Sequence, residues 1–372
     1  MKLKNLLLTG CLSLGLTACG GGSDEPETPT PEPDPTPSPT PEPAPTPNST
    51  TFYKGADISW VTEMEKKGHK FYNSKGEERE CTALMKELGL NAIRLRVWVN
   101  PTDKWCNKED VLVKAQRAAN LGMDIMIDFH YSDSWADPSK QNIPAAWKSH
   151  SYEEMKKDVK QHTKEVLELL KKNNITPKWV QIGNETSNGF LWEVGQADKN
   201  PKQYAGLFAA GYEAAKSVFS DITVIVHLDN GFDNSLYNWN LDILKNNGAK
   251  WDMIGMSLYP YWAALYNNMT ASKVISQCID NIKKVSNKYN CDVMIVETGM
   301  ECADGNGKLA SSSVLENGKT LLTNIIKECK ENTNERCKGV FYWEPECQPS
   351  QYKLGAFTEN GKPTVIMDAF KD

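Results

Sequence analysis

The sequence predicts a single (β/α)8 barrel over residues 51–372. First, eight short apolar runs rich in β-branched residues alternate with amphipathic helical patterns. Second, these runs are apolar on both faces, as expected for parallel strands covered by helices. Third, no glycine-rich dinucleotide-binding turn follows the runs, which disfavours a doubly wound sheet. A region of this length without a second linker is within the usual range of the barrel.

The predicted strands and helices alternate along the whole region. The strands span residues 54–60, 91–99, 123–131, 178–185, 222–230, 251–259, 292–298 and 339–344. The helical patterns span residues 77–89, 108–121, 152–173, 201–219, 234–247, 270–289 and 315–331. The third helix follows Ser151, with Glu154 three residues later, which is the pattern of a capping box.

Residues 1–18 have the pattern of a secretory signal. Lys2 and Lys4 precede an apolar stretch from Leu6 to Leu16, which is shorter than the ~20 residues needed to span a bilayer. The segment and the residue after it read Leu16-Thr17-Ala18-Cys19, which resembles a bacterial lipoprotein signal. We therefore expect Cys19 to carry lipid as the first residue of the mature protein. The alternative is an ordinary cleavage site near Cys19.

Residues 19–50 form a Pro/Thr-rich linker that contains 11 of the 20 prolines. The composition of residues 23–50 favours extended polyproline II, with a reach of roughly 85 Å for these residues. The acidic run Ser23-Asp24-Glu25 resembles the export signal of some Bacteroidetes lipoproteins. We expect an exported protein, lipid-anchored to the outer membrane at the cell surface.

The composition excludes some classes of binding partner, and the cysteine count predicts disulfides. The formal net charge of −6 argues against a nucleic-acid partner or binding to an anionic membrane surface. We also expect a monomer, attached to the membrane through its lipid. Eight of the ten cysteines lie in the barrel region, without a CxxC pair. An even number in an exported protein predicts disulfides rather than metal ligands. From loop placement we expect the pairs 81–106, 278–291, 302–347 and 329–337.

The C-terminal ends of the predicted strands are polar or aromatic. In a (β/α)8 barrel the active site forms at these ends. One polar end would fit a cap or an ion pair, but many together predict a site. The residues that we assign to it are Asp57, Arg94, Arg96, Asp128, His130, Trp135, Asn184, Glu185, His227, Tyr259, Glu297 and Trp343.

Two of these residues are glutamates that end apolar runs, Glu185 and Glu297. A carboxylate in such a place is costly unless chemistry or a partner requires it. No Ser-His-Asp order, P-loop or HExxH motif is present. Two carboxylates among aromatic side chains suit glycoside hydrolysis, in which one protonates the leaving oxygen and the other attacks the sugar or activates water. The residues alone do not assign these two roles.

Three motifs make the prediction more specific. They are Ile93–Pro101 (IRLRVWVNP), Asp128–Pro138 (DFHYSDSWADP) and Gln181–Thr186 (QIGNET). Together with Glu297 they closely resemble glycoside hydrolase family 53, the endo-β-1,4-galactanases, over residues 52–370. The resemblance implies endo-acting cleavage of galactan side chains of pectin, with retention of configuration. It also implies that Glu185 is the acid/base and Glu297 the nucleophile.

The resemblance also suggests how other residues act. An arginine of the second strand and Tyr259 would keep Glu297 ionised, whereas Glu185 needs a raised pKa. Trp343 resembles the platform beneath the reacting sugar. Substrate contacts are expected from His130, Trp135 and His227, although His227 would equally suit a hydrogen-bonded core position.

Three residues carry further alternatives. Arg94 and Arg96 share one strand face, and each would equally suit neutralising a buried carboxylate. Asn184 would bind a sugar hydroxyl, but strict alternation places it opposite Glu185, so we expect a bulge or twist at that strand end.

The last expectations concern metal and activity. Hydrolysis requires no cofactor, but bacterial relatives can hold calcium between the seventh and eighth loops, which makes Asp304 and Asn306 candidate ligands. The alternative is a glycine-rich turn without metal. The alternative activities are another β-glycanase, such as a mannanase, and a surface lipoprotein that binds glycans without cutting them. A pure binding module would not need both Glu185 and Glu297.

Overall fold

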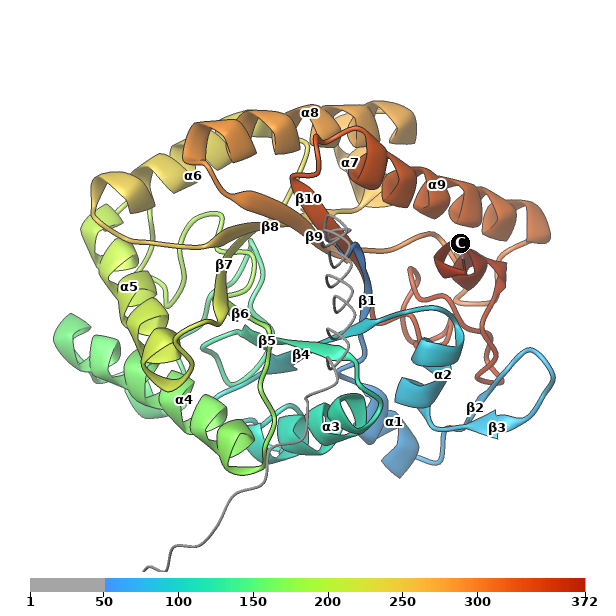
Figure 1. Ribbon diagram of the computed structural model, residues 1–372, viewed down its shortest axis with the longest axis horizontal. Coiled ribbons are helices and arrows are strands. Elements are labelled where there is room, and N and C mark those ends of the chain that lie inside the picture. Colours follow the sequence, from blue (N-terminus) through green and yellow to red (C-terminus); the bar gives the residue numbers. More distant parts are fainter. Residues whose placement is uncertain (1–50, 372) are drawn as a thin grey trace, which may run out of the picture. The chain divides into compact units, whose positions relative to one another are not determined.

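Eight parallel strands form a closed barrel in the order β1-β10-β9-β8-β7-β6-β5-β4 (Figure 1). The computed structural model describes residues 51–371, so the signal segment, Cys19 and the linker lie outside the described residues. The barrel strands are β1 (Tyr53–Asp57), β4 (Ala92–Val97), β5 (Asp124–Phe129), β6 (Trp179–Ile182), β7 (Thr223–Leu228), β8 (Met253–Leu258), β9 (Asp292–Thr298) and β10 (Cys337–Trp343). The predicted (β/α)8 barrel is therefore confirmed.

A ring of helices surrounds the barrel (Figure 1). The helices are α1 (Val61–Lys66), α2 (Cys81–Glu87), α3 (Lys108–Asn120), α4 (Tyr152–Lys172), α5 (Pro201–Val218), α6 (Asn234–Asn246), α7 (Pro260–Asn267), α8 (Ala271–Tyr289) and α9 (Ser312–Glu331). Two short 3-10 helices, Ala145–Trp147 and Val365–Phe370, and a hairpin of β2 (Phe71–Tyr72) and β3 (Glu78–Arg79) complete the elements. All seven predicted helices are present, whereas α1, α7 and the hairpin were not predicted.

Local sequence signals account for several boundaries. The predicted capping box starts α4, because Glu154 accepts from the Ser151 backbone N–H at 2.7 Å and Ser151 Oγ accepts from the Glu154 N–H at 3.4 Å. Asn107 caps α3 in the same way as Ser151 caps α4, through its side chain. Most predicted strands extend past the observed ends, because the polar residues at those ends belong to loops.

The interior of the barrel changes from apolar to polar along the strands. Alternate residues of a strand point to the same side, and those near the strand starts form a separate apolar cluster that includes Ala92, Met126, Trp179 and Ile225. Two residues further along the same strands, the buried side chains are Arg94, Asp128, Gln181 and His227. The strand ends therefore carry a polar layer above an apolar one, and this layer becomes the floor of the site.

The predicted disulfides are wrong, because all eight cysteines of residues 51–371 are free thiols. None of the pairs 81–106, 278–291, 302–347 and 329–337 is formed. Seven of these cysteines are buried and pack as small core residues. Cys106 Sγ donates to Ser59 O at 3.7 Å, and Cys302 Sγ donates to Phe357 O at 3.9 Å. The even count thus does not reflect disulfides, although the thiols of one expected pair, Cys329 and Cys337, lie within hydrogen-bond reach of each other.

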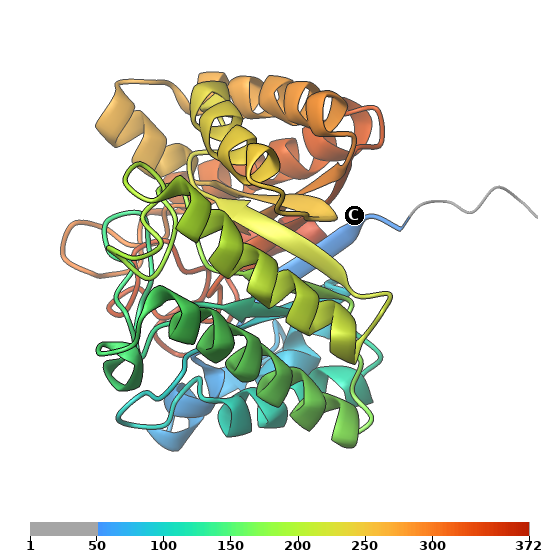
Figure 2. The same ribbon diagram turned by 90° about the vertical axis from the view of Figure 1, so that its left-hand side faces the viewer.

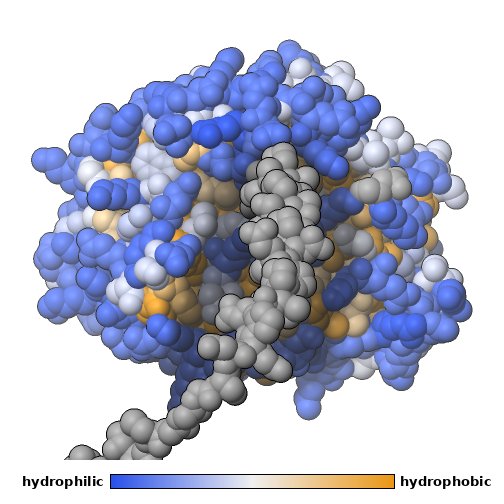
Figure 3. Space-filling model, viewed as in Figure 1, coloured by the Kyte–Doolittle hydropathy of each residue, from blue (hydrophilic) through white to orange (hydrophobic). Residues whose placement is uncertain are grey.

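The edge of the face seen in Figure 3 is mainly hydrophilic. Figure 3 shows hydrophilic residues around the rim of the visible face, with hydrophobic residues in smaller areas inside that rim. Among the helices of residues 51–371, none combines the length and the apolar character that crossing a membrane requires.

Candidate active site

A cavity of about 460 Å³ lies at the C-terminal ends of the barrel strands, and it contains both predicted catalytic glutamates. Figure 2 shows the connecting segments gathered at this end of the barrel, on its left-hand side. The lining residues are His130, Trp135, Ala136, Asp137, Lys140, Asn184, Glu185, Tyr259, Trp262, Glu297, Trp343 and Tyr352. Residues far apart in sequence thus form one aromatic and acidic site.

A tight turn after β6 brings Asn184 and Glu185 to the same site. Gly183 (φ 82°) and Glu185 (φ 45°) both have left-handed backbone conformations. A Cβ atom on Gly183 would lie 2.4 Å from Thr186 Cγ2. The expected departure from strand alternation is therefore a turn that begins where β6 ends at Ile182, rather than a bulge within the strand.

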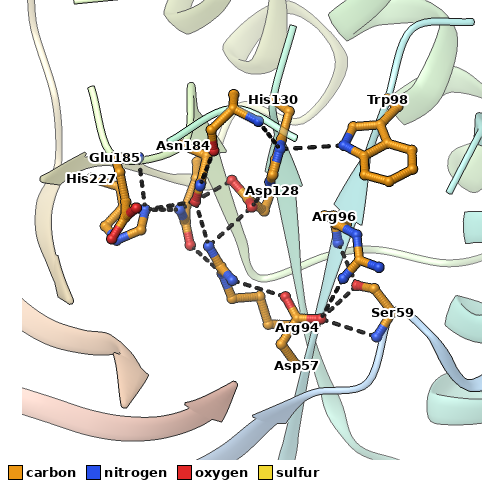
Figure 4. A network of polar contacts seen from close by, with 12 residues as sticks. Asp57, Ser59, Arg94, Arg96, Trp98, Asp128, His130, Asn184, Glu185 and His227 are labelled. Atoms are coloured by element: carbon orange, nitrogen blue, oxygen red, sulfur yellow. Dashed lines mark hydrogen bonds and ion pairs between the residues drawn. The ribbon is translucent and has the colours of Figure 1, made fainter. Parts of the chain in front are cut away.

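The Arg94 guanidinium is the centre of the polar layer (Figure 4). It is fully buried and forms ion pairs with Asp57 at 2.8 Å, Asp128 at 2.9 Å and Glu297 at 2.8 Å. Its Nε donates to Gln181 Oε1 at 2.6 Å. Buried charges need such compensation, so Arg94 positions the carboxylates and supplies the positive charge nearest to Glu297.

Glu297 is held from both sides. Arg94 Nη2 lies 2.8 Å from Oε1, and the Tyr259 hydroxyl donates to Oε2 at 2.9 Å. Burial raises the pKa of Glu297 to about 7, although the Arg94 guanidinium and the Tyr259 hydrogen bond act in the opposite direction. Burial also raises the pKa of Tyr259 well above its ordinary value, so its hydroxyl remains a neutral donor.

Glu185 has a different environment. Burial, followed by the negative charge of Glu297, raises the pKa of Glu185 well above its ordinary value. No cation pairs with its carboxyl group among the ion pairs of the described residues; instead, Ser257 Oγ donates to Oε1 at 2.6 Å. The two carboxyl groups therefore differ: one faces a guanidinium and a phenol, and the other a single hydroxyl.

His130 joins the cavity to the polar layer. Its Nε2 lies 2.9 Å from Asp128 Oδ2, while Trp98 Nε1 and the Ala136 N–H donate to its Nδ1 at 3.3 and 3.2 Å. Since both donors reach Nδ1, the ring proton is on Nε2 and is donated to Asp128. Although burial opposes it, Arg94 and His130 keep the pKa of Asp128 below its ordinary value.

Arg96 lies beneath the aromatic part of the lining. Its Nη1 pairs with Glu344, and its guanidinium carbon lies 5.2, 5.3 and 4.3 Å from the ring centroids of Trp60, Trp98 and Trp135. These are cation–π distances. Arg96 thus supports the tryptophans and is not part of the cavity lining.

The ten predicted substrate-binding residues divide into two groups. Those in the cavity lining are His130, Trp135, Asn184, Tyr259 and Trp343. Those buried beneath it are Asp57, Arg94, Arg96, Asp128 and His227. Arg94 pairs with Glu297, and His227 accepts from the Glu185 backbone N–H. Asp128 and Arg96 contact the lining residues His130 and Trp135. Asp57 reaches the site through its ion pair with Arg94.

Five lining residues were not predicted. Ala136 and Asp137 lie within the motif Asp128–Pro138, which was the available signal. Trp262 lies on α7, which begins at Pro260, a favoured first residue of a helix. Lys140 and Tyr352 come from loops without a signal in the sequence.

The proposed calcium ligands do not fit a metal site. Asp304 Oδ1 already accepts from the backbone N–H groups of Asn306 at 2.8 Å and Lys308 at 2.9 Å. These backbone hydrogen bonds lower the pKa of Asp304. Over residues 51–371, no group of three or more His, Cys, Asp or Glu side chains is arranged to hold a metal ion. Asp304 therefore stabilises its own turn through hydrogen bonds to the backbone.

Comparisons with known proteins identify the family. Residues 53–365 match the model of Glycosyl hydrolase family 53. The endo-β-1,4-galactanase of Bacillus subtilis (strain 168) is 32% identical over 338 residues, which cover 86% of this chain and 75% of that protein. A GH53 catalytic domain of Ignisphaera aggregans is 29% identical with a TM-score of 0.77, covering 87% of this chain and 96% of that one. A solved fungal β-1,4-galactanase is 28% identical with a TM-score of 0.76, covering 86% and 98%. The chain therefore belongs to glycosyl hydrolase family 53.

Proposed function

We propose that this glycoside hydrolase is an endo-β-1,4-galactanase that cuts galactan side chains of pectin with retention of configuration. The observation that carries the proposal is the pair Glu185 and Glu297 in one aromatic-lined cavity, with unequal surroundings. The similarity to relatives named as endo-β-1,4-galactanases supports the choice of galactan.

The environments of the two carboxyl groups fit a double displacement. Glu297, paired with Arg94, is the nucleophile: its carboxylate bonds to the anomeric carbon as the bond to the leaving oxygen breaks. Glu185, whose pKa is raised, is the acid and gives its proton to that oxygen. In the second step Glu185 takes a proton from water, and the hydroxide oxygen replaces Glu297 at the anomeric carbon. The reaction uses only these two groups and water, without a cofactor.

The cavity also offers groups that would hold the sugar. Trp343 and Trp135 present aromatic rings, whose centroids are 5.8 Å apart, on which a pyranose can stack. Asn184 is held in place by its own hydrogen bonds to Ala136 O (2.8 Å) and Arg94 (3.0 Å), with its side chain at the cavity wall. Such fixed groups bind a sugar with little ordering cost.

Incubation with linear β-1,4-galactan tests the proposal. We expect new reducing ends, with none from β-mannan. Proton NMR of the first-formed product should show the β-anomer. Glu297→Gln should abolish turnover while oligosaccharide binding remains measurable by calorimetry. Cleavage of mannan alone would favour another β-glycanase, and binding without cleavage by the wild type would favour a glycan-binding protein.

We also propose export and lipid anchoring through Cys19, on the basis of the signal pattern alone. In a bacterial host that processes lipoproteins, the protein should incorporate labelled palmitate and fractionate with the outer membrane. Cys19→Ser should lose the label and become soluble. Retention of label in that variant would contradict the assignment, and resistance to added protease on intact cells would contradict surface exposure.

A further inference from the structure

The ends of three neighbouring strands form a hydrogen-bonded chain that leads to Glu185. His227 lies on β7 and Ser257 on β8, and both are buried, at 0% and 2% exposure. His227 Nε2 lies 2.9 Å from Ser257 Oγ, which in turn lies 2.6 Å from Glu185 Oε1. Since these atoms are shielded from bulk water, their hydrogen-bond directions are set by the protein.

The proton of His227 is on Nε2. Gln181 Nε2 at 2.9 Å and the Glu185 backbone N–H at 3.2 Å both point at His227 Nδ1, and an amide N–H can only donate. The orientation of Gln181 is fixed, because its Oε1 accepts from Arg94 Nε at 2.6 Å. Asn184 Oδ1 also lies 3.1 Å from Nδ1, but the two N–H groups aimed at Nδ1 leave no place for a hydrogen on that nitrogen. Nδ1 is therefore an acceptor.

The ring is also neutral. Burial, with the nearby Arg94 charge as the second cause, lowers the pKa of His227 well below its ordinary value. A neutral imidazole with an occupied Nδ1 acceptor has one remaining function, which is to donate from Nε2 to Ser257 Oγ. The Ser257 hydroxyl hydrogen must then point to its other partner, Glu185 Oε1.

From this direction of donation, we propose that Ser257 and His227 are positioning residues that keep Glu185 Oε1 unprotonated and place the catalytic proton on Oε2. This inference rests on the proposed function of Glu185 as the acid/base. When Glu185 is protonated, Oε1 accepts from Ser257 and only Oε2 can carry the proton. When Glu185 has given up that proton, the same hydroxyl stabilises the carboxylate, and Oε2 is the oxygen that takes the proton of the attacking water.

The kinetic test compares Ser257→Ala, Ser257→Thr and wild type on galactan and on a dinitrophenyl β-galactobioside. The dinitrophenolate leaves without protonation, and kcat/KM reports the first chemical step. Ser257→Ala should lower kcat/KM on galactan about tenfold or more, with a much smaller loss on the dinitrophenyl substrate. The alkaline limb of its kcat/KM–pH profile should move to higher pH, because the Glu185 carboxylate loses the Ser257 hydroxyl as a donor. Ser257→Thr should restore both properties.

A matched control is Ser286→Ala. Ser286 is an equally buried serine on α8, and its hydroxyl donates to Lys283 O at 3.2 Å, away from the cavity lining. It should leave the leaving-group dependence and the pH profile unchanged, and thermal unfolding would verify that each variant folds. Equal losses on both substrates, with an unmoved alkaline limb, would overturn the proposal.

A second measurement does not depend on turnover. Nitrogen-15 NMR of the five histidines, with His227 assigned from a His227→Gln variant, should show a neutral ring protonated at Nε2. A ring protonated at Nδ1 would overturn the proposal whatever the enzyme cleaves. Failure to release reducing ends from galactan, with the Nε2 proton in place, would instead count against the proposed function.

Discussion

The stability lost when Arg94 is replaced should grow as the pH rises. Arg94 is fully buried and pairs with Asp57, Asp128 and Glu297 at 2.8–2.9 Å. Arg94→Met keeps much of the side-chain volume but leaves three buried carboxyl groups without their central cation. Removing one partner of a buried ion pair costs about 3–5 kcal/mol. At roughly 2 °C per kcal/mol for a chain of this size, Tm should fall by about 6–10 °C at pH 8.

The sign of the pH effect follows from linkage. In the wild type, Arg94 contributes to holding the pKa of Asp128 below its ordinary value, so this stabilisation is present above the unfolded-state pKa and is lost as the pH falls. Without the cation, burial raises the pKa values of the carboxyl groups above those of the unfolded chain. The folded variant then binds protons that the folded wild type does not, so its loss of stability relative to the wild type should be smallest at low pH and should grow as the pH rises.

Thermal unfolding of wild type and Arg94→Met between pH 5 and 8 measures this effect. Arg117→Met is the control, because Arg117 also pairs with two carboxylates, Glu65 and Glu80, but is 29% exposed. The free energy of unfolding of Arg117→Met should fall by no more than about 1 kcal/mol, and this loss should vary little with pH. The reasoning is refuted if the Arg94→Met loss is no larger than that of the control, or is equal at pH 5 and pH 8.

Three further predictions concern single groups. Tyr259→Phe removes a donor that favours the ionised form of Glu297, so the acidic limb of kcat/KM should move to higher pH; an unmoved limb in a pH–rate profile would contradict this. Gly183→Ala forces a Cβ to within 2.4 Å of a threonine methyl at φ 82° and should cost about 1–3 kcal/mol in urea unfolding. Gly122→Ala, at φ 66° with no atom within 4 Å, should cost less, and equal costs would argue against the steric reason. EDTA should leave Tm unchanged, because Asp304 is satisfied by backbone donors; a fall in Tm that calcium reverses would restore the metal site.

The sequence predicted the barrel because both of its signals are local. Runs apolar on both faces mark parallel strands, and the polar residues that end them, such as Glu185 and Glu297, mark the rim. What it left open is which inward residues reach the cavity and which lie beneath it. Arg94 and Arg96 share one face of β4, yet Arg94 contacts Glu297 and Arg96 contacts Glu344, because different strand ends lie opposite each.

Other features depended on contacts that periodicity does not encode. Ser257 is an unremarkable serine in an apolar run, and its role follows only from the distance to Glu185 across two strands. Helix α7 is short and aromatic, so its pattern merges with the preceding strand, and Trp262 was missed with it. For the cysteines of residues 51–371, the sequence suggested a feature that is absent. Their even number predicted disulfides, whereas they are free thiols, most of them buried in the core.

The change from apolar to polar along the barrel interior has a consequence for how the strands find their register. A slip of two residues between β4 and β5 keeps every inward side chain inward, so the alternation of apolar and polar residues would not oppose it. In the native register Arg96 lies beside Asp128 and Arg94 beside Met126. A slip that moves a charged residue down into the apolar layer would leave that charge buried without partners, at a cost of several kcal/mol. The polar layer thus also disfavours barrels that close in a shifted register. The same side chains therefore serve both the chemistry and the choice of the correct strand pairing.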